Sequence, residues 1–387
     1  MNSKTDHDDL AITLGVEEEF FLVDPESRDL VTDPDPALFE DCKNAAGSHR
    51  IVHELFRSQI ETNSRVCGSV DEVRQALVDT RNTVIDIADK YGVAVMAAST
   101  HPTGSWQAQV TTPMERYERF AATFQESVRR FFVGGMHIHA GFGDPDTRIR
   151  VMTGIRRYLP LLHALSASSP FGGGRETGFK SYRLTLVGVL PRTGMPGPFD
   201  SRAQYDELLE TYRDMKFVDD GSELWWDIRP SHAFPTIEMR ICDICTRVED
   251  AVCIAALYAS LIRWLMRKER KGELPPEPLT EIIMENRWIA QRYGVVAFFG
   301  DRVHEGGRID IDDYAEALLE ELASDAQALG CEDELHRATT IIREGTGADR
   351  QIDLYRLRIL EGDTHDEALR HVIDQILADT RAGLGGG

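Results

Sequence analysis

Four short segments of the chain place ionisable side chains at alternate positions between large apolar ones. Successive side chains of a β-strand point to opposite faces, so this alternation predicts strands with one apolar and one charged face. In GVEEEFFLV (residues 15–23), Glu17 and Glu19 fall on one face, with Cα atoms about 6–7 Å apart. The other segments are SQIETNS (residues 58–64), GGMHIHAG (residues 134–141) and TIEMRIC (residues 236–242). The chain is therefore expected to build a sheet whose two faces differ in polarity.

The alternation has a simpler reading, which stays open for any one segment: a solvated face of an antiparallel sheet. Solvated strand faces usually carry Thr, Lys, Gln or Ser, whereas these carry Glu, His and Arg, the residue types that bind metals and phosphates. Gly and bulky apolar residues also bracket the segments, as expected for strands inside a sheet. The four segments together favour a functional face.

Glutamates dominate the predicted charged faces. If the faces converge, Glu17, Glu19, Glu61 and Glu238, with Glu54 upstream, place four or five negative charges in one cavity. Carboxylates at close range raise one another's pKa unless cations bind between them, and oxygen-rich sites select Mg²⁺ or Mn²⁺. An imidazole from the HIH segment is compatible with these ions and does not by itself imply zinc. The sequence therefore predicts a site for hard divalent cations.

Strand-like and helical segments alternate without a regular βαβ rhythm, and the last third reads almost entirely as helix. Strands are predicted at residues 12–23, 60–63, 93–98, 135–142, 181–190 and 236–242. Helices are predicted at residues 70–91, 113–132, 146–167, 201–215 and 248–271, before a helical layer over about 277–384. Nothing reads as a linker, so we expect a single α+β domain, residues 1–387.

Composition narrows the classes of partner. The net charge of −22 argues against nucleic acid, which needs a basic surface. No stretch of about 18 uncharged apolar residues is present, and residues 1–9 are polar and acidic, unlike a signal peptide. We therefore expect a cytoplasmic protein that does not bind membranes.

The six cysteines are too few for a disulfide framework, and the single CxxC of Cys242 and Cys245 is interpreted as structural.

Common nucleotide motifs are missing. Residues 173–181 (GGRETGFKS) resemble a P-loop, but Phe179 separates Gly178 from Lys180, and no strand followed by a helix frames the segment. A GxGxxG dinucleotide motif is also absent. If ATP is a substrate, the metal cluster and arginine side chains must hold it.

Seven blocks, taken together and in order, resemble the carboxylate-amine ligase family that includes type 2 glutamate–cysteine ligases, in the glutamine synthetase superfamily. The blocks are GVEEEF (15–20), QIETNS (59–64), STHP (99–102), GMHIHAG (135–141), SPFGGGRETGFKSYR (169–183), DIRPSHAFPTIEMRICD (227–243) and ENRWIAQRYG (285–294). The resemblance implies a large curved antiparallel sheet, with helices on its convex face and Mg²⁺ ions and ATP on its concave face. Ser99 departs from the usual Gly before Thr-His-Pro.

The resemblance also implies roles for single residues. Those that it marks as metal ligands are Glu17, Glu19, Glu61, His137 and Glu238, with Glu54 as a further candidate. Arg240 is implied to face the phosphates and, with Glu61, to be catalytic. Arg183, Arg229 and His139 are implied to contact the nucleotide or another anion, although a structural ion pair is the alternative for each arginine.

The implied function is an ATP- and Mg²⁺-dependent ligase that joins glutamate to cysteine through an acyl phosphate, forming γ-glutamylcysteine. A ligase with another amine acceptor is the first alternative. A dinuclear metallohydrolase would use the same Glu and His set to activate water. A guanidino kinase and a non-catalytic metal-binding protein are further alternatives, and assembly into a homo-oligomer is left open.

Overall fold

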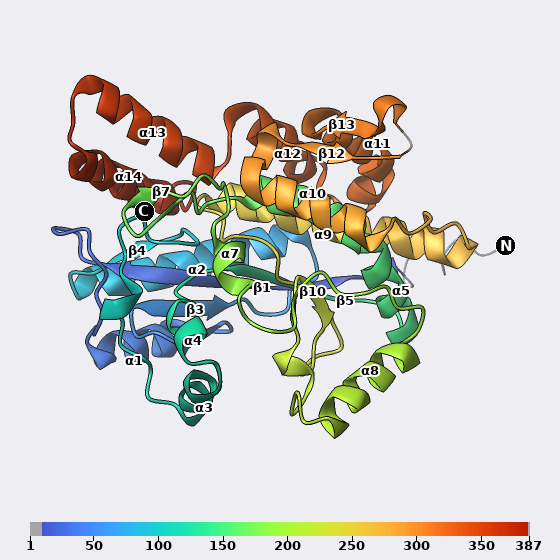
Figure 1. Ribbon diagram of the computed structural model, residues 1–387, viewed down its shortest axis with the longest axis horizontal. Coiled ribbons are helices and arrows are strands. Elements are labelled where there is room, and N and C mark those ends of the chain that lie inside the picture. The colour runs from blue at the N-terminus through green and yellow to red at the C-terminus, as the bar shows by residue number, and fades with distance from the viewer. Residues whose placement is uncertain (1–9, 303, 386–387) are drawn as a thin grey trace.

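The structure, a computed structural model, describes residues 10–302 and 304–385, and its centre is a seven-stranded sheet (Figure 1). The strands follow the order β10-β11-β5-β1-β3-β2, and β4 pairs with β1 beside this path. All of these pairings are antiparallel. The strands are β1 (Thr13–Val23), β2 (Arg50–His53), β3 (Gln59–Asn63), β4 (Ala94–Met96), β5 (Met136–Gly141), β10 (Ile228–Pro230) and β11 (Ile237–Met239).

The apolar face of this sheet lies against helices. Leu14, Val16, Phe20 and Leu22 of β1 are buried in the main core, as are Met136, Ile138 and Ala140 of β5. The helices that contribute to this core include α2 (Val70–Lys90), α5 (Pro145–Ile155) and α9 (Val248–Lys271). The alternation along the chain thus predicted the correct orientation of these strands, because burial of every second apolar side chain fixes which face looks inward.

One charged residue of β1 points into the apolar side. Glu18 is fully buried and accepts hydrogen bonds from Arg81 of α2, at 2.9 Å from Nε and 2.5 Å from Nη2. Two further donors of Arg81 go to the carbonyl oxygens of Cys245 and Thr246. A buried carboxylate needs a partner of opposite charge that is itself hydrogen-bonded. Of the three consecutive glutamates, the middle one is therefore structural.

Helix α9 lies in the centre of the helical part of the protein, where helices before and after it in the chain pack on it, and 18 of its 24 residues are buried. Glu249 and Asp250 occupy its first turn, basic residues occupy its last turn, and Gly272 ends it in the left-handed conformation. The chain before α9 also contains helices α1 (Pro36–Ala45), α3 (Glu115–Phe124), α4 (Glu126–Arg129), α6 (Leu159–Ser166), α7 (Arg183–Val187) and α8 (Arg202–Asp214).

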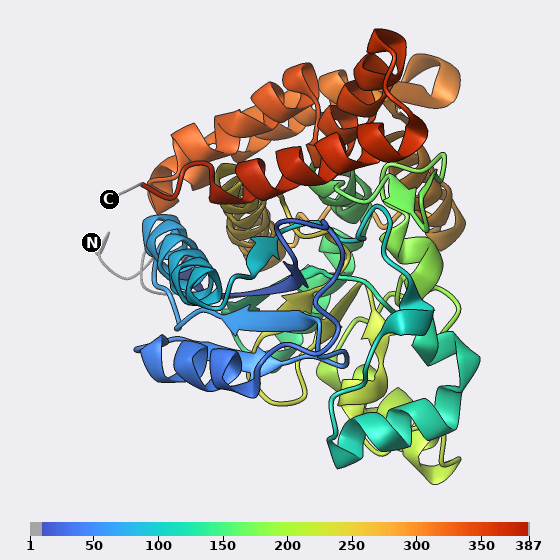
Figure 2. The same cartoon turned by 90° about the vertical axis from the view of Figure 1, so that its left-hand side faces the viewer.

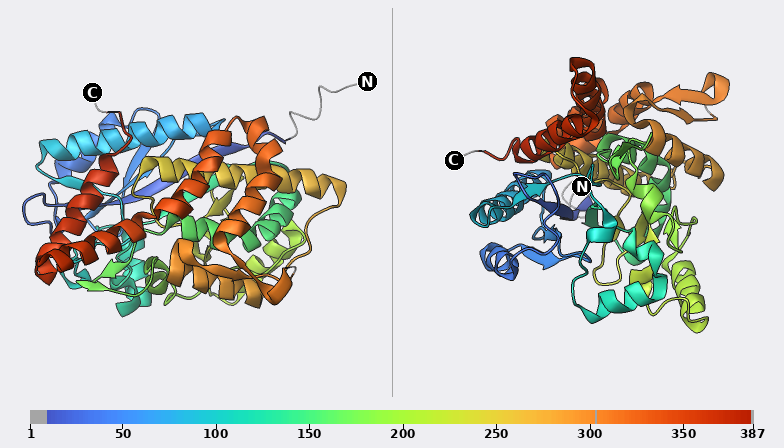
Figure 3. Two further views of the ribbon diagram at one scale, coloured as in Figure 1. Left: turned by 90° about the horizontal axis from the view of Figure 1, so that it is seen from above. Right: turned by 60° about the vertical axis from the view of Figure 1, so that its left-hand side comes forward.

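The C-terminal helices form a layer along one side of the molecule, as Figures 2 and 3 show, and part of this layer packs on α9. This layer consists of α10 (Thr280–Tyr293), α11 (Ile311–Leu329), α12 (Glu332–Glu344), α13 (Gly347–Glu361) and α14 (His365–Arg381). Capping boxes of Thr346 with Asp349 and of Thr364 with Glu367 start the last two helices. Helix α14 reaches back to β4, so the layer also contacts the sheet.

Three segments differ from the sequence prediction. Residues 181–190 contain helix α7 rather than a strand, because Tyr182 accepts main-chain hydrogen bonds from Thr185 and Leu186. A short apolar alternation does not distinguish the two structures.

The helix predicted at 113–132 breaks at Gln125, whose φ is 50°. The helical layer is interrupted by a hairpin of β12 (Phe298–Gly300) and β13 (Arg308–Asp310). Further two-stranded pairs are β6 (Phe171–Gly172) with β7 (Arg175–Glu176), and β8 (Thr193–Gly194) with β9 (Trp225–Trp226).

Among the described residues, no helix combines the length and the apolar character needed to cross a membrane. Residues 1–9, on which the comparison with signal peptides depends, lie outside the described part of the chain.

Candidate active site

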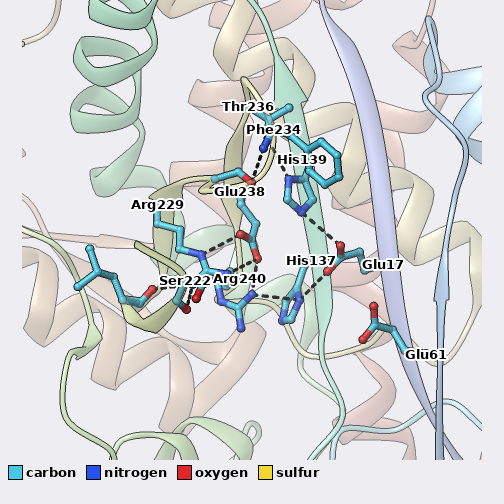
Figure 4. Close-up of polar contacts among 12 residues, drawn as sticks. Glu17, Glu61, His137, His139, Ser222, Arg229, Phe234, Thr236, Glu238 and Arg240 are labelled. Carbon is cyan, nitrogen blue, oxygen red and sulfur yellow. Dashed lines mark hydrogen bonds and ion pairs between the residues drawn. The ribbon is translucent and has the colours of Figure 1, made fainter. Parts of the chain in front are cut away.

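The polar face of the sheet gathers the predicted ligands from four strands. Glu17 lies opposite His137, Glu19 lies opposite Glu61, and Glu238 lies opposite His139 in the antiparallel register. Residues directly opposite one another share a face. Figure 4 shows that Glu17, His137, His139 and Glu238 point toward one another from β1, β5 and β11. Segments more than 200 residues apart along the chain therefore meet at one site.

The ionisable side chains form two groups along this face. In each group, candidate ligand atoms of the three members lie within 4.8 Å of one another. We call Glu17, His137 and Glu238 the His137 cluster, and Glu19, Glu54 and Glu61 the Glu61 cluster. All six predicted ligands thus fall into two separate groups, and Glu54, the weakest candidate in the sequence, belongs to the second one.

His137 is the central nitrogen donor of its cluster. Its Nδ1 lies 3.2 Å from Glu17 Oε2 and 3.4 Å from Arg240 Nη1. Burial and then the charge of Arg240 lower the pKa of His137 to about 4, so the ring is neutral and keeps a lone pair for a metal. Burial raises the pKa of Glu17, but hydrogen bonds with His137 and His139 outweigh burial and hold that pKa below its ordinary value.

Glu238 carries the negative charge next to two guanidinium groups. Arg229 donates to it from Nε at 2.8 Å, and Arg240 donates to it from Nη1. Burial raises the pKa of Glu238, but the charges of Arg240 and Arg229 outweigh burial and lower it well below its ordinary value. Arg229 also donates to the carbonyl oxygens of Ser222 and Leu224, so it is held more firmly than Arg240.

The Glu61 cluster consists of carboxylates that face one another. Burial and the charge of Glu61 raise the pKa of Glu19 to about 7. Burial and the charge of Glu54 raise the pKa of Glu61 well above its ordinary value. Burial and the charge of Glu19 in turn raise the pKa of Glu54. Asn63 donates to Glu61 Oε1 at 2.5 Å, and the amide of Gly135 donates to Glu19 Oε2 at 2.7 Å. Such a set of half-buried carboxylate oxygens fits a hard divalent cation, which would relieve the repulsion.

Arg183 lies behind Arg240 rather than in the open part of the site. Its guanidinium donates to the carbonyl oxygens of Arg240 and Ile241 at 3.2–3.3 Å, and the residue is 5% exposed. A Cβ at Gly135 would lie 2.5 Å from Arg183 Nη2, and one at Gly134 would lie 2.6 Å from the carbonyl oxygen of Glu19. The paired glycines let this arginine and strand β1 approach the start of β5.

His139 lies beside the His137 cluster, next to Glu17. Its Nε2 is 3.4 Å from Glu17 Oε1, and its Nδ1 is 2.9 Å from the hydroxyl of Thr236. Phe234 packs edge-on against the ring, with centroids 6.0 Å apart. The imidazole is therefore partly exposed and oriented on both sides, consistent with a contact to a bound ligand.

The sequence analysis did not assign a role to one ion pair that supports the site. Arg287 of α10 donates to both oxygens of Asp227, at 2.6 and 3.0 Å. The carbonyl oxygen of Asp227 accepts hydrogen bonds from the main-chain N–H groups of Arg240 and Ile241, at 2.8 and 3.1 Å. Arg287 thus holds the main chain that carries Arg240. Both residues stand in blocks of the resemblance, ENRWIAQRYG and DIRPSHAFPTIEMRICD, and this was the only signal for them.

Comparison with known proteins assigns the chain to a family. The model of "Glutamate-cysteine ligase family 2" matches residues 13–375, which contain every residue of both clusters. The chain belongs to this family. It is 42% identical over 378 residues to a protein of Rhodospirillum rubrum, with 97% of each chain covered, and that relative is named "Putative glutamate--cysteine ligase 2". A protein of Jannaschia sp. with the same name is 39% identical over 375 residues, covering 96% of this chain and 97% of the relative.

Two solved structures share the fold of this family member at low sequence identity. One is the glutamate–cysteine ligase of Francisella tularensis in complex with AMP, with a TM-score of 0.65, 13% identity and coverage of 97% of this chain and 90% of that one. The other is a bifunctional glutathione synthetase of Pasteurella multocida, with a TM-score of 0.66, 17% identity and coverage of 97% and 53%. The expected α+β fold, an antiparallel sheet with a helical C-terminal layer, is confirmed.

Proposed function

We propose that the protein is an ATP- and Mg²⁺-dependent ligase that joins the γ-carboxylate of glutamate to an amine, with cysteine as the first candidate acceptor. The observation that carries this proposal is the pair of ligand clusters on one sheet face, with Arg240 and Arg229 beside the His137 cluster. Membership of glutamate-cysteine ligase family 2 supports the choice of substrates. Both substrates and ATP are cytoplasmic metabolites, so we place the reaction there.

The two clusters are proposed to hold divalent cations. Glu17, His137 and Glu238 would bind an ion at the phosphates, and Glu19, Glu54 and Glu61 would bind one nearer to the carboxylate that is activated. When bound, such ions neutralise phosphate charge and orient the phosphates, and either Mg²⁺ or Mn²⁺ suits the oxygen-rich donors. We propose that Glu61 is catalytic because it would hold such an ion, and Asn63 donates a hydrogen bond that keeps its carboxylate in place.

The first step transfers the γ-phosphoryl group of ATP to the carboxylate. A carboxylate oxygen attacks the γ-phosphorus, the bond to the β-phosphate oxygen breaks, and ADP leaves an acyl phosphate behind. This transfer needs positioning and charge neutralisation more than covalent help from the protein. Arg240 is suited to the phosphoryl group because only part of its fork is engaged, by Glu238 and His137. Arg229 and Arg183 are proposed to support it, and His139 to contact the nucleotide.

The second step forms the amide. The amine nitrogen attacks the carbonyl carbon of the acyl phosphate, the carbon–oxygen bond to phosphate breaks, and the nitrogen loses a proton. No Ser or Cys nucleophile is required. Accordingly, all six cysteines are buried free thiols, and burial raises the pKa of both Cys242 and Cys245.

A dinuclear metallohydrolase is the main rival, because the same donors could activate water. The two arginines beside Glu238 favour the ligase, since a hydrolase needs no cation for a transferred phosphoryl group. The test is to incubate the protein with ATP, Mg²⁺, glutamate and single amines, and to measure ADP and amide together. We expect ADP and amide in equal amounts. Substrate hydrolysis without ATP would overturn the proposal in favour of the hydrolase.

A further inference from the structure

A polar cavity of about 530 Å³ is lined on one side by Phe132, three residues before Gly135, whose amide donates to Glu19 Oε2. The residues that line it include Arg130 and Arg175 but no carboxylate. This composition is unusual in a chain with a net charge of −22. Trp106, Phe132 and Tyr182 add aromatic walls. We call it the Arg130/Arg175 pocket, and its charge favours an anionic ligand.

Two walls of the pocket, Phe132 and Tyr182, adjoin residues of the site. The ring of Phe132 packs on Phe21, with centroids 4.8 Å apart, and Phe21 follows Glu19 by two positions on the same face of β1. On another side, Tyr182 immediately precedes Arg183, the arginine that overlies Gly135. The pocket thus adjoins the part of β1 that follows Glu19, whereas Arg229 and Glu238 lie on β10 and β11, toward one edge of the sheet.

The two arginines are available to a ligand to different degrees. Arg175 is exposed and has no ion-pair partner among residues 10–302 and 304–385, and the neighbouring Glu176 is bound by Arg356 at 2.8 Å. Arg130 lies over the ring of Trp106 at 5.6 Å and contacts Glu126 at 3.4 Å, at a largely exposed position. An ion pair this exposed contributes little and can exchange for a ligand carboxylate.

The loop that carries Arg175 is held in place by main-chain contacts. The amide of Gly174 donates to the carbonyl oxygen of Pro102 at 2.9 Å, and His365 Nε2 lies 2.8 Å from the carbonyl oxygen of Gly174. Helix α14 therefore fixes the loop from outside. The main chain that carries Arg175 is thus positioned before a ligand binds, so binding orders only the side chain and loses less entropy.

We propose that the Arg130/Arg175 pocket binds the α-carboxylate of an amino-acid substrate, the carboxylate that is not activated. The inference rests on the proposed ligase function, which uses two amino acids. ATP is placed at the Arg229 and Arg240 end, and a guanidinium matches a carboxylate with two parallel hydrogen bonds. The α-carboxylate belongs either to glutamate or to the acceptor, and the two share this chemistry.

The test compares Arg175→Gln and Arg130→Gln with the parent, measuring KM separately for ATP, glutamate and the acceptor. We expect about a tenfold or larger increase in KM for one amino acid, as for loss of a hydrogen bond to a charged group, and unchanged KM for ATP. Arg175→Lys should restore part of the loss. Arg343→Gln, at an exposed pair with Glu344 outside the pocket, is the matched control and should change none of the three values.

Analogues that lack the α-carboxylate separate binding from a structural effect. These are 4-aminobutyrate in place of glutamate and cysteamine in place of cysteine. The parent should disfavour the analogue of the affected substrate by about tenfold, and Arg175→Gln should cause no further loss with it, because the interaction is already absent. The comparison of analogues identifies which amino acid the pocket binds. The measurement on the parent protein does not depend on whether a variant folds.

The outcomes are distinct. An unchanged KM for both amino acids in both variants, or an increase confined to ATP, overturns the pocket assignment while amide formation by the parent upholds the ligase. If the parent makes no amide with any amine, the proposed function falls, and this inference falls with it.

Discussion

Glu19 and Glu61 lie directly opposite each other in the antiparallel register of β1 and β3, and both residues are half-buried. Burial and the charge of Glu61 raise the pKa of Glu19 to about 7 from 4.5. In the absence of metal, the folded state therefore retains a proton that the unfolded chain releases. This contribution to the free energy of unfolding is present below about pH 4.5 and is lost as the pH rises to about 7.

This arrangement predicts how Mg²⁺ stabilises the protein. Metal binding requires deprotonated carboxylates, so Mg²⁺ should raise Tm more at pH 8 than at pH 5. The measurement is thermal unfolding at several pH values with Mg²⁺ or with a chelator. Glu61→Gln should abolish most of the pH-dependent part, whereas Asp312→Asn in the exposed group of Asp310, Asp312 and Asp313 should not. Equal Tm shifts at both pH values would contradict the cation site.

Arg240 should be essential for turnover but not for folding. Arg240→Lys keeps the charge beside Glu238 but loses the planar fork, so we expect kcat to fall by about a hundredfold or more with little change in Tm. Arg202→Lys, at an exposed pair with Asp206, is the matched control and should behave like the parent. A parental kcat in the Arg240→Lys variant would make Arg240 structural.

Arg287 should act on catalysis through Asp227. Arg287→Gln removes two hydrogen bonds to Asp227, whose carbonyl oxygen holds the main chain of Arg240, so kcat should fall and Tm should decrease. Asp227→Asn alone should have a similar effect. The double variant should lose much less than the sum of the two, because both substitutions break the same contact. Fully additive losses in kcat would show that the pair does not work as a unit.

The two glycines before β5 predict a contrast between neighbouring substitutions. Gly134→Ala places a Cβ 2.6 Å from a main-chain oxygen, which cannot move away, and should destabilise the protein by about 1–3 kcal/mol. Gly135→Ala meets the guanidinium of Arg183 and should reduce activity more than stability. Gly15→Ala, where the nearest atom is 3.9 Å away, is the control and should be tolerated. Equal behaviour of all three variants would contradict this packing.

Much of the polar face could be predicted from period-2 alternation, because a strand that buries one face fixes the direction of every other side chain. That rule places Glu17, Glu19, His137 and Glu238 correctly without any knowledge of strand order. It also explains the misassigned segment 181–190, where short alternation occurs in a helix that begins at Arg183.

Other features depend on contacts that spacing along the chain does not encode. Arg287 and Asp227 are 60 residues apart, and the engagement of Arg229 by Glu238 follows from the pairing of β10 with β11. The position of Glu54 beside Glu19 and Glu61 follows from the turn that precedes β3. The division of six ligands into two clusters likewise required the strand order.

The most direct test of the proposed reaction follows an oxygen atom. Glutamate labelled with ¹⁸O in the γ-carboxylate is incubated with the protein, ATP, Mg²⁺ and cysteine, and the released phosphate is analysed by mass spectrometry. Attack of the carboxylate on ATP transfers one labelled oxygen to phosphate, so we predict phosphate with one ¹⁸O in an amount equal to the amide. Unlabelled phosphate would contradict an acyl phosphate, and amide formation without ATP consumption would contradict the ligase itself.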